Sequence, residues 1–128
     1  MAASPLDGFA DARYVSLATF RRDGREVRTP VWLALRDGRA YVFTETRAGK
    51  VKRVRANGRA ALATCTLRGE VTGPFVPAVA RIVDDAATVA AAYAALRAKY
   101  GWQMWLIDCL SKLSGRYDQR AIIEIAPA

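Results

Sequence analysis

The sequence predicts one mainly β domain: a six-stranded, mainly antiparallel sheet or small barrel, with one short helix after the third strand and two helices before the last. Segments rich in β-forming residues in the first half are separated by Asp-Gly pairs, which favour tight hairpin turns. Repeated β-helix-β units, which would indicate a doubly wound parallel sheet, do not occur. We therefore treat residues 1–128 as a single domain and expect residues 1–11 to form a flexible N-terminus.

The first half of the chain is expected to form a three-stranded meander. Its strands are predicted at residues 13–20, 27–35 and 41–46, with turns at Asp23-Gly24 and Asp37-Gly38. Pro30 falls inside the second strand, and proline has no N–H to donate to a neighbouring strand. It therefore indicates a sheet edge, a bulge, or a place where the backbone faces something other than a strand.

The second half mixes helices and strands. Val51 and Val54 continue a three-residue spacing from Ala48, which predicts a short helix over residues 48–57. Two further helices are expected at 86–100, entered through two aspartates and stopped at Gly101, and at 102–113, where apolar residues recur at helical spacing. The remaining strands are predicted at residues 59–67, at 70–85 with a bend near Gly73-Pro74 and Pro77, and at 120–127.

Composition narrows the classes of function. The formal charge of +8 favours an anionic partner and leaves nucleic acid, a lipid surface and a phosphorylated small molecule open. Cys65 and Cys109 lie in apolar surroundings and are expected to be free thiols, which fits a cytoplasmic location. No segment reaches the roughly 20 apolar residues of a membrane helix, so no membrane partner is expected. The absence of histidine excludes His-based nucleophile pairs, His-ligated zinc and an axial His for haem, and no metal site is predicted.

Residues 44–59 carry an unusual density of positive charge. Six cations face one acid, Glu45, within this segment. Thr44 and Thr46 are expected on one side of the third strand's end, and Lys50 and Arg53 project from the following helix. Hydroxyls, cations and the free amides of a helix N-terminus are the groups that hold a phosphate. The alternative is a basic helix face that is simply solvated.

A family resemblance rests on "YVSLATFRRDGREVRTPVWLALRDGRAYVFTETRAGKVKRVRANGRAALATC", continuing to "GEVTGPFVPAVARIVDD", with "KYGWQMWLI" near the C-terminus. This combination resembles the pyridoxamine 5'-phosphate oxidase-like split β-barrels (the FMN-binding split barrel superfamily). Within them it resembles the PPOX-class oxidoreductases that depend on the deazaflavin coenzyme F420. Gly58 departs from the family pattern, which commonly has proline after the asparagine, and this position concerns the start of a strand rather than the cofactor site.

The resemblance implies a homodimer whose cofactor lies in a groove between two barrels. It assigns Thr44, Thr46, Lys50 and Arg53 to the phosphate, with Lys52 as a weaker candidate. It also assigns Thr29, Pro30, Val31 and Trp32 to the ring of the cofactor. Trp32 has an equally good explanation as a half-buried strand aromatic.

The expected activity is hydride transfer from reduced coenzyme F420 to an unsaturated or heteroaromatic small molecule. The catalytic proton donor is not identified, because Tyr14, Tyr41, Tyr100 and Asp108 are equivalent candidates at this level. The alternatives are an FMN-dependent reductase or oxidase of the same fold, and a non-catalytic carrier or sensor that binds F420 or flavin. Nucleic acid is a remote alternative and not an expected partner, because the basic helix carries no aromatic residue on which a base could stack.

Overall fold

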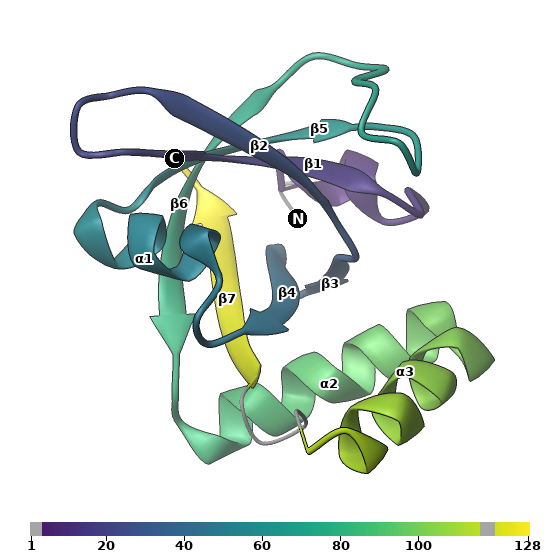
Figure 1. Ribbon diagram of the computed structural model, residues 1–128. Helices are drawn as coiled ribbons and strands as arrows, with labels where there is room; N and C mark the ends of the chain where they lie inside the picture. Colours follow the sequence, from purple (N-terminus) through teal and green to yellow (C-terminus); the bar gives the residue numbers. More distant parts are fainter. Residues whose placement is uncertain (1–3, 116–119) are drawn as a thin grey trace.

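The computed structural model describes residues 4–115 and 120–128, and its strands curl into a mainly antiparallel half-barrel with helices outside it (Figure 1). This confirms the predicted fold class, with seven strands rather than six in one sheet of order β2-β1-β5-β6-β7-β4-β3. The strands are β1 (Val15–Phe20), β2 (Glu26–Val31), β3 (Ala34–Arg36), β4 (Arg39–Glu45), β5 (Arg59–Thr64), β6 (Val76–Val83) and β7 (Arg120–Pro127). The helices are the 3-10 turn η1 (Asp7–Phe9) and the α-helices α1 (Gly49–Ala56), α2 (Ala86–Tyr100) and α3 (Trp102–Leu113).

Both Asp-Gly pairs form the predicted turns. Gly24 has a φ of 90° between β1 and β2, and Asp37 and Gly38 have φ of 53° and 77° between β3 and β4. Two successive residues with positive φ match the right-handed twist of the flanking strands, and glycine and aspartate accept that conformation most readily.

The extra strand arises because the predicted strand over residues 27–35 is broken. It divides into β2 and β3 at Trp32 and Leu33, and the two pieces pair with different partners, β1 and β4, at opposite edges of the sheet. The reason is tertiary: the N–H and C=O of Leu33 bond to side chains of α2 instead of to a strand. Pro30 lies in β2, which is an edge strand, as its missing N–H indicated.

The strand predicted over residues 70–85 is also shorter than expected. Only Val76–Val83 forms β6, and before it Val71 makes an isolated bridge to Cys65. The interruption lies at Gly73-Pro74, where glycine weakens a strand and proline cannot donate. Pro77, in contrast, is accommodated inside β6 opposite Ala61.

The core lies inside the curled sheet and continues under α2. Leu17, Leu62 and Ile123 are fully buried within the barrel, while Leu96 and Met104 form a second cluster between the helices and the sheet. The α2–α3 pair lies along one side of the barrel and α1 lies on another (Figure 1). The helices thus cover two separate faces of the sheet.

Residues 1–3 of the N-terminus, which was expected to be flexible, lie outside the described residues. Within the part that is described, Leu6 and Phe9 are buried in the main core. The N–H of Leu6 bonds to Ser4 Oγ, which itself donates to the carbonyl of Gly38 in the β3–β4 turn. Residues 4–9 therefore pack against the barrel.

Candidate functional site

The cations of α1 face the end of β4. Lys50 Nζ lies 3.4 Å from Thr44 Oγ1, and Arg53 Nε donates to Thr19 Oγ1 at 2.6 Å. A Cβ placed on Gly49 would lie 2.8 Å from Arg53 Nη1, so this glycine leaves room for the guanidinium at the start of the helix. Two cations and two hydroxyls therefore meet at the N-terminal end of α1.

This cluster carries uncompensated positive charge. Among the described residues, neither Lys50 nor Arg53 forms an ion pair with a carboxylate. Burial lowers the pKa of Lys50 and the adjacent Arg53 lowers it further, while Glu45 acts in the opposite direction. Burial, followed by repulsion from Arg21, likewise lowers the pKa of Arg53. An anion bound here would relieve both costs.

The first turn of α1 adds backbone amides that have no side-chain cap to this charge. The N-cap residue Ala48 has no side chain that could accept a hydrogen bond from the helix amides. The helix therefore presents its positive end beside Lys50 and Arg53, and an anion would find both amides and cations there.

Lys52 and Thr46 lie apart from this cluster. Lys52 is exposed and lines a groove of about 420 Å³ together with Arg21, Arg22 and Arg25, and Arg53 reaches this groove as well. Thr46 lines a different hollow of about 460 Å³ with Arg55. The structure thus brings Thr44, Lys50 and Arg53 together and places Lys52 and Thr46 at neighbouring sites.

The four residues of the ring segment lie at the open edge of β2. Val31 is buried and Pro30 exposed, and β2 pairs on one side only, with β1. Thr29 Oγ1 is buried and has no hydrogen-bond partner in the part of the chain that the structure describes. A buried hydroxyl without a partner is uncommon in native proteins. A polar ligand at this edge would satisfy it, so the residues fit a cofactor with hydrogen-bonding ring atoms.

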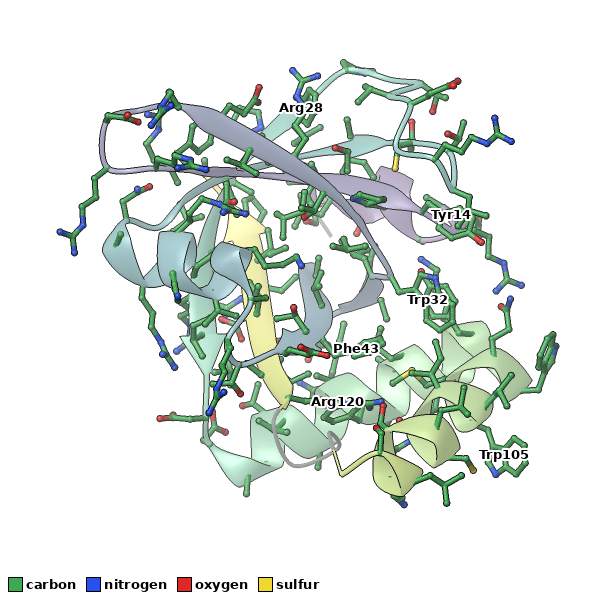
Figure 2. The ribbon with its side chains drawn as sticks, in the orientation of Figure 1. Tyr14, Arg28, Trp32, Phe43, Trp105 and Arg120 are labelled. Atoms are coloured by element: carbon green, nitrogen blue, oxygen red, sulfur yellow. The ribbon has the colours of Figure 1, made fainter. Side chains whose placement is uncertain are left out.

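Trp32 is the last residue of the ring segment, directly after the end of β2, and it packs toward the helices (Figure 2). Its ring stacks on Tyr100 with centroids 4.4 Å apart and planes at 5°, and meets the edge of Phe43 at 6.3 Å. It is half-buried. The indole therefore lies in a half-buried aromatic environment, as one of the two interpretations of Trp32 expected. Because Trp32 also directly follows β2, its assignment to the ring of the cofactor stays a prediction.

A cavity of about 600 Å³ lies beside Thr44 and was not predicted from the sequence. Its apolar wall is formed by Phe43, Ile107 and Leu110. The polar part of the wall comes from Thr44, Glu45, Ser111, Ser114 and Arg120. These residues come from β4, α3 and β7, so no local pattern could have found the cavity.

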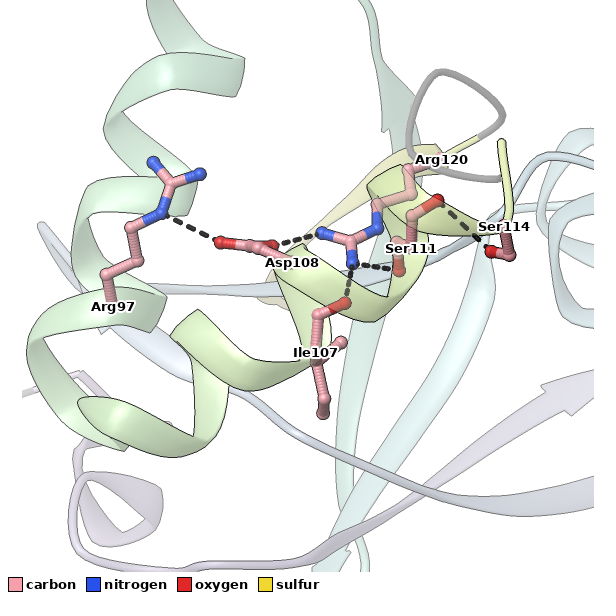
Figure 3. Close-up of polar contacts among 6 residues, drawn as sticks. All are labelled: Arg97, Ile107, Asp108, Ser111, Ser114 and Arg120. Atoms are coloured by element: carbon pink, nitrogen blue, oxygen red, sulfur yellow. Dashed lines mark hydrogen bonds and ion pairs between the residues drawn. The ribbon is translucent and has the colours of Figure 1, made fainter.

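Arg120 is the centre of a polar network in that wall (Figure 3). It donates to Asp108 Oδ1 at 2.7 Å and to Ser111 Oγ at 2.6 Å, and its guanidinium lies 4.9 Å from the centre of the Phe43 ring. Asp108 also accepts from Arg97 at 3.2 Å. The network ties α2, α3 and β7 together. The signal in the sequence that could have indicated this network is Asp108, an acidic residue within a mainly apolar helix.

Three of the four proton-donor candidates are engaged elsewhere. Asp108 is held by two arginines, Tyr41 donates to Glu124 at 2.9 Å, and Tyr100 donates to the carbonyl of Arg13 at 2.9 Å. Each of these three side chains is bonded to another part of the protein, so its contacts do not identify it as the catalytic acid.

Across residues 4–115 and 120–128, no three His, Cys, Asp or Glu side chains come together as a metal site would require. Both cysteines are free thiols. None of the helices described has the length and apolar character needed to cross a bilayer.

Solved structures resemble this fold over nearly the whole chain. A conserved hypothetical protein, Rv2991 of Mycobacterium tuberculosis, is 19% identical with a TM-score of 0.71, over 99% of this chain and 81% of its own. The heme storage protein HutZ of Vibrio cholerae is 17% identical with a TM-score of 0.70, over 100% and 92%. A heme binding protein of Mycobacterium smegmatis is 19% identical with a TM-score of 0.63, over 90% and 46%. At these identities the likeness shows the fold alone.

The family is shown by sequence. No curated protein matches the chain. The family model described as pyridoxamine 5'-phosphate oxidase, however, matches residues 6–128, and therefore covers every strand and helix described above. The chain belongs to the pyridoxamine 5'-phosphate oxidase-like superfamily, the FMN-binding split barrels.

Proposed function

We propose that the protein is an oxidoreductase that binds coenzyme F420 and reduces an unsaturated or heteroaromatic small molecule in the cytoplasm. The observation that carries this proposal is the cation cluster at the start of α1. Lys50 and Arg53 are partly buried, neither pairs with a carboxylate of residues 4–115 or 120–128, and Thr44 lies within reach of Lys50. A phosphate is the ligand that such a cluster suits best.

The residues of the chain have separable tasks in this proposal. Lys50, Arg53 and Thr44 hold the phosphate, while Thr29 and the open edge of β2 orient the ring. The bound deazaflavin supplies the hydride. The chain contributes position and the exclusion of water rather than a nucleophile, in keeping with a site that has no histidine.

The cavity beside Thr44 is the place for the substrate. It adjoins the phosphate cluster through Thr44, and Phe43, Ile107 and Leu110 give it an apolar wall. At about 600 Å³ it lies within the range of pockets that hold small molecules. A flat molecule with few charges fits this wall better than a sugar or a polyanion.

FMN is the second candidate cofactor, because the same phosphate cluster and the same orphaned Thr29 hydroxyl serve it equally well. The non-catalytic alternative is a carrier or sensor that binds coenzyme F420 or FMN without turning it over. The charge of +8 favours coenzyme F420, whose oligoglutamate tail adds carboxylates beyond the phosphate. The two similar structures that concern heme raise a third ligand, but this chain has no histidine to offer its iron.

We also propose that the protein is a homodimer, with a partner copy completing the groove. The exposed face of α3 supports this proposal, because Trp102, Trp105 and Leu113 are 71%, 65% and 86% exposed. Leu110 belongs to this face and also lines the cavity, so a partner docked on α3 would cover the cavity mouth. In a chain of charge +8, a mainly apolar face that includes one exposed cation, Lys112, is where two copies repel each other least.

The first test is a titration of the purified apoprotein with coenzyme F420, FMN and heme in parallel, followed by tryptophan and cofactor fluorescence. Tight binding of F420 with weaker binding of FMN supports the proposal and justifies a screen of reducible heteroaromatic compounds. Preference for FMN selects the flavin enzyme, and preference for heme overturns the assignment of an oxidoreductase. Mixed-sequence DNA at physiological salt serves as the control polyanion and is expected not to bind.

A further inference from the structure

The short connection between β2 and β3 is held by the C-terminal end of α2. We propose that Tyr100, assisted by Lys99, is a positioning residue that fixes Trp32 and the open edge of β2 for cofactor binding. The inference rests on the proposed function for the role of that edge. The contacts that carry it are independent of any cofactor.

Tyr100 holds the peptide that follows Trp32. The N–H of Leu33 donates to Tyr100 Oη at 3.0 Å, and Tyr100 Oη donates to the carbonyl of Arg13 at 2.9 Å. The hydroxyl has a single proton, and the carbonyl of Leu33, at 3.3 Å, is its more distant acceptor. One hydroxyl therefore bridges the β2–β3 connection and Arg13, which lies two residues before β1, the strand that pairs with β2.

Lys99 holds the other side of the same peptide. Its Nζ donates to the carbonyl of Leu33 at 2.6 Å and lies 3.4 Å from the carbonyl of Phe9. Leu33 is fully buried, so its N–H and C=O would be costly to leave unpaired. Side chains of two successive residues of α2 thus take the place of a neighbouring strand.

The ring of Tyr100 acts on the side chain of Trp32 itself. The two rings stack at 4.4 Å with planes at 5°, and Phe43 contacts the indole edge-on. Tyr100 therefore fixes the indole with its ring and the next peptide with its hydroxyl. Since Pro30 and Thr29 lie two and three residues before Trp32, the end of the ring-binding segment is anchored at this point.

The charged surroundings of Lys99 agree with a positioning role. Burial, assisted by nearby Arg13 and opposed by Asp11, lowers the pKa of Lys99 to about 8. The ammonium also lies 5.2 Å from the centre of the Tyr100 ring. Its cost of burial is offset mainly by the carbonyl groups that it binds.

The test compares Tyr100→Phe with Tyr41→Phe in the full chain. Both changes remove the hydroxyl of a buried tyrosine and keep the ring, but Tyr41 bonds to Glu124 and not to the β2–β3 connection. Two quantities are measured: the Kd for coenzyme F420 and FMN, and the hydrogen–deuterium exchange of the Leu33 amide in the apoprotein. Tyr100→Phe is expected to weaken binding of the preferred cofactor about tenfold, the scale of one lost hydrogen bond. It should also speed exchange at Leu33, while Tyr41→Phe changes neither at a similar loss of Tm.

The conservative change at Lys99 gives a second readout. Lys99→Met should weaken binding, and Lys99→Arg should restore most of it, because a guanidinium can still donate to the carbonyl of Leu33. A merely structural role would make binding follow Tm in every variant. Equal Kd values for Tyr100→Phe and Tyr41→Phe would overturn the proposal.

Failure of the proposed function gives a different result. If the wild type binds neither cofactor, the functional proposal fails. Slow exchange of the Leu33 amide in the wild type, together with faster exchange in Tyr100→Phe, would then still establish the contact between Leu33 and Tyr100. Fast exchange at Leu33 in the wild type overturns the inference whatever the cofactor result. If Tyr100→Phe does not fold, Lys99→Met and the wild-type exchange rate decide.

Discussion

At the scale of single residues, side chains that lack an ionic or hydrogen-bonding partner among the described residues are the candidates for ligand binding. Lys50 and Arg53 are cations without a carboxylate, and Thr29 Oγ1 is a buried hydroxyl without a partner among the described residues. Glu124 is the opposite case. This buried carboxylate accepts from Tyr41, Arg39 and Arg81 and clamps three strands together. We propose that the first group binds a ligand, while Glu124 already has its partners.

Lys50→Ala should weaken cofactor binding by about 1.5 to 3 kcal/mol, the range for a hydrogen bond to a charged group. The free energy of unfolding should change little, because the ammonium of Lys50 pairs with no carboxylate among the described residues. Titration calorimetry of the apoprotein with the preferred cofactor measures the loss. Lys52→Ala is the matched control, since it removes an exposed lysine of the same helix and should have a smaller effect. Equal effects at both positions would remove Lys50 from the site.

Glu124→Gln should lower the free energy of unfolding by about 1.5 to 3 kcal/mol at neutral pH, since two arginines and Tyr41 lose their charged acceptor. Burial raises the pKa of Glu124, but hydrogen bonds from Arg81 and Tyr41 outweigh it and leave the pKa below its ordinary value of 4.5. The folded state therefore holds the proton more weakly than the unfolded state. This contribution is complete above pH 4.5 and is lost as the pH falls through the folded pKa.

Urea unfolding of both forms between neutral pH and acid measures this difference. The wild type should lose stability more steeply than Glu124→Gln, and the two curves should converge in acid. Parallel curves would show that the pKa of Glu124 is the same in the folded and the unfolded state, and would contradict the prediction.

At the scale of elements, α1 lacks a stabilising side-chain cap at the end where we propose that a phosphate binds. It is eight residues long, has no side-chain cap at Ala48, and carries basic residues along its exposed face. A helix this short is marginal on its own, so Val51 and Val54 must hold it against the barrel. The missing cap is a cost to folding that leaves the helix amides available to an anion.

Ala48→Asp separates folding from binding at this helix. The extended backbone at residue 48 is that of an N-cap, so an aspartate there should stabilise the fold by about 0.5 to 2 kcal/mol. The same carboxylate would compete with a phosphate for the amides and for Lys50, so cofactor affinity should fall. Thermal unfolding and cofactor titration are measured on one preparation. A variant that gains both stability and affinity would show that the phosphate lies elsewhere.

At the scale of the whole molecule, charge and apolar surface are segregated. The basic grooves lie around α1 and the β1–β2 turn, whereas the exposed tryptophans lie on α3, where Trp105 projects away from the barrel (Figure 2). An aromatic side chain presents about 150 to 250 Å². The large apolar side chains of α3 together therefore expose several hundred Å², the order of the roughly 800 Å² that each partner buries in a stable interface.

The double variant Trp105→Glu, Leu113→Glu should convert the proposed dimer to a monomer, because it places charge at the centre of the apolar face. Both side chains are mostly exposed, so the fold should be unaffected. Light scattering coupled to size exclusion measures the mass. Leu67→Glu is the control, since Leu67 is also 68% exposed but lies in the loop after β5. A dimer that survives the double variant would place the interface on another face.

The local features of this protein were predictable because neighbouring residues decide them. Asp-Gly pairs made the turns at Gly24 and Gly38, the aspartate before α2 capped it at Thr88, and Pro30 marked an edge strand. The cation density of residues 44–59 likewise follows from composition, whatever its position in space. The resemblance carried by the first strands led to the superfamily that the family model then showed.

The sequence by itself determined the fold class, the turns and the helices, and it suggested the segment that we propose to bind a phosphate, since each depends on residues close together in the chain. Only the tertiary structure decided where β2 ends, because Lys99 and Tyr100 take hydrogen bonds that a strand would otherwise make, from more than sixty residues away. It alone placed Glu124 beside two arginines, left the Thr29 hydroxyl without a partner in the described part of the chain, and built a cavity from β4, α3 and β7. Hydrogen bonds and cavities form between elements, and their partners are chosen by the packing of the folded chain.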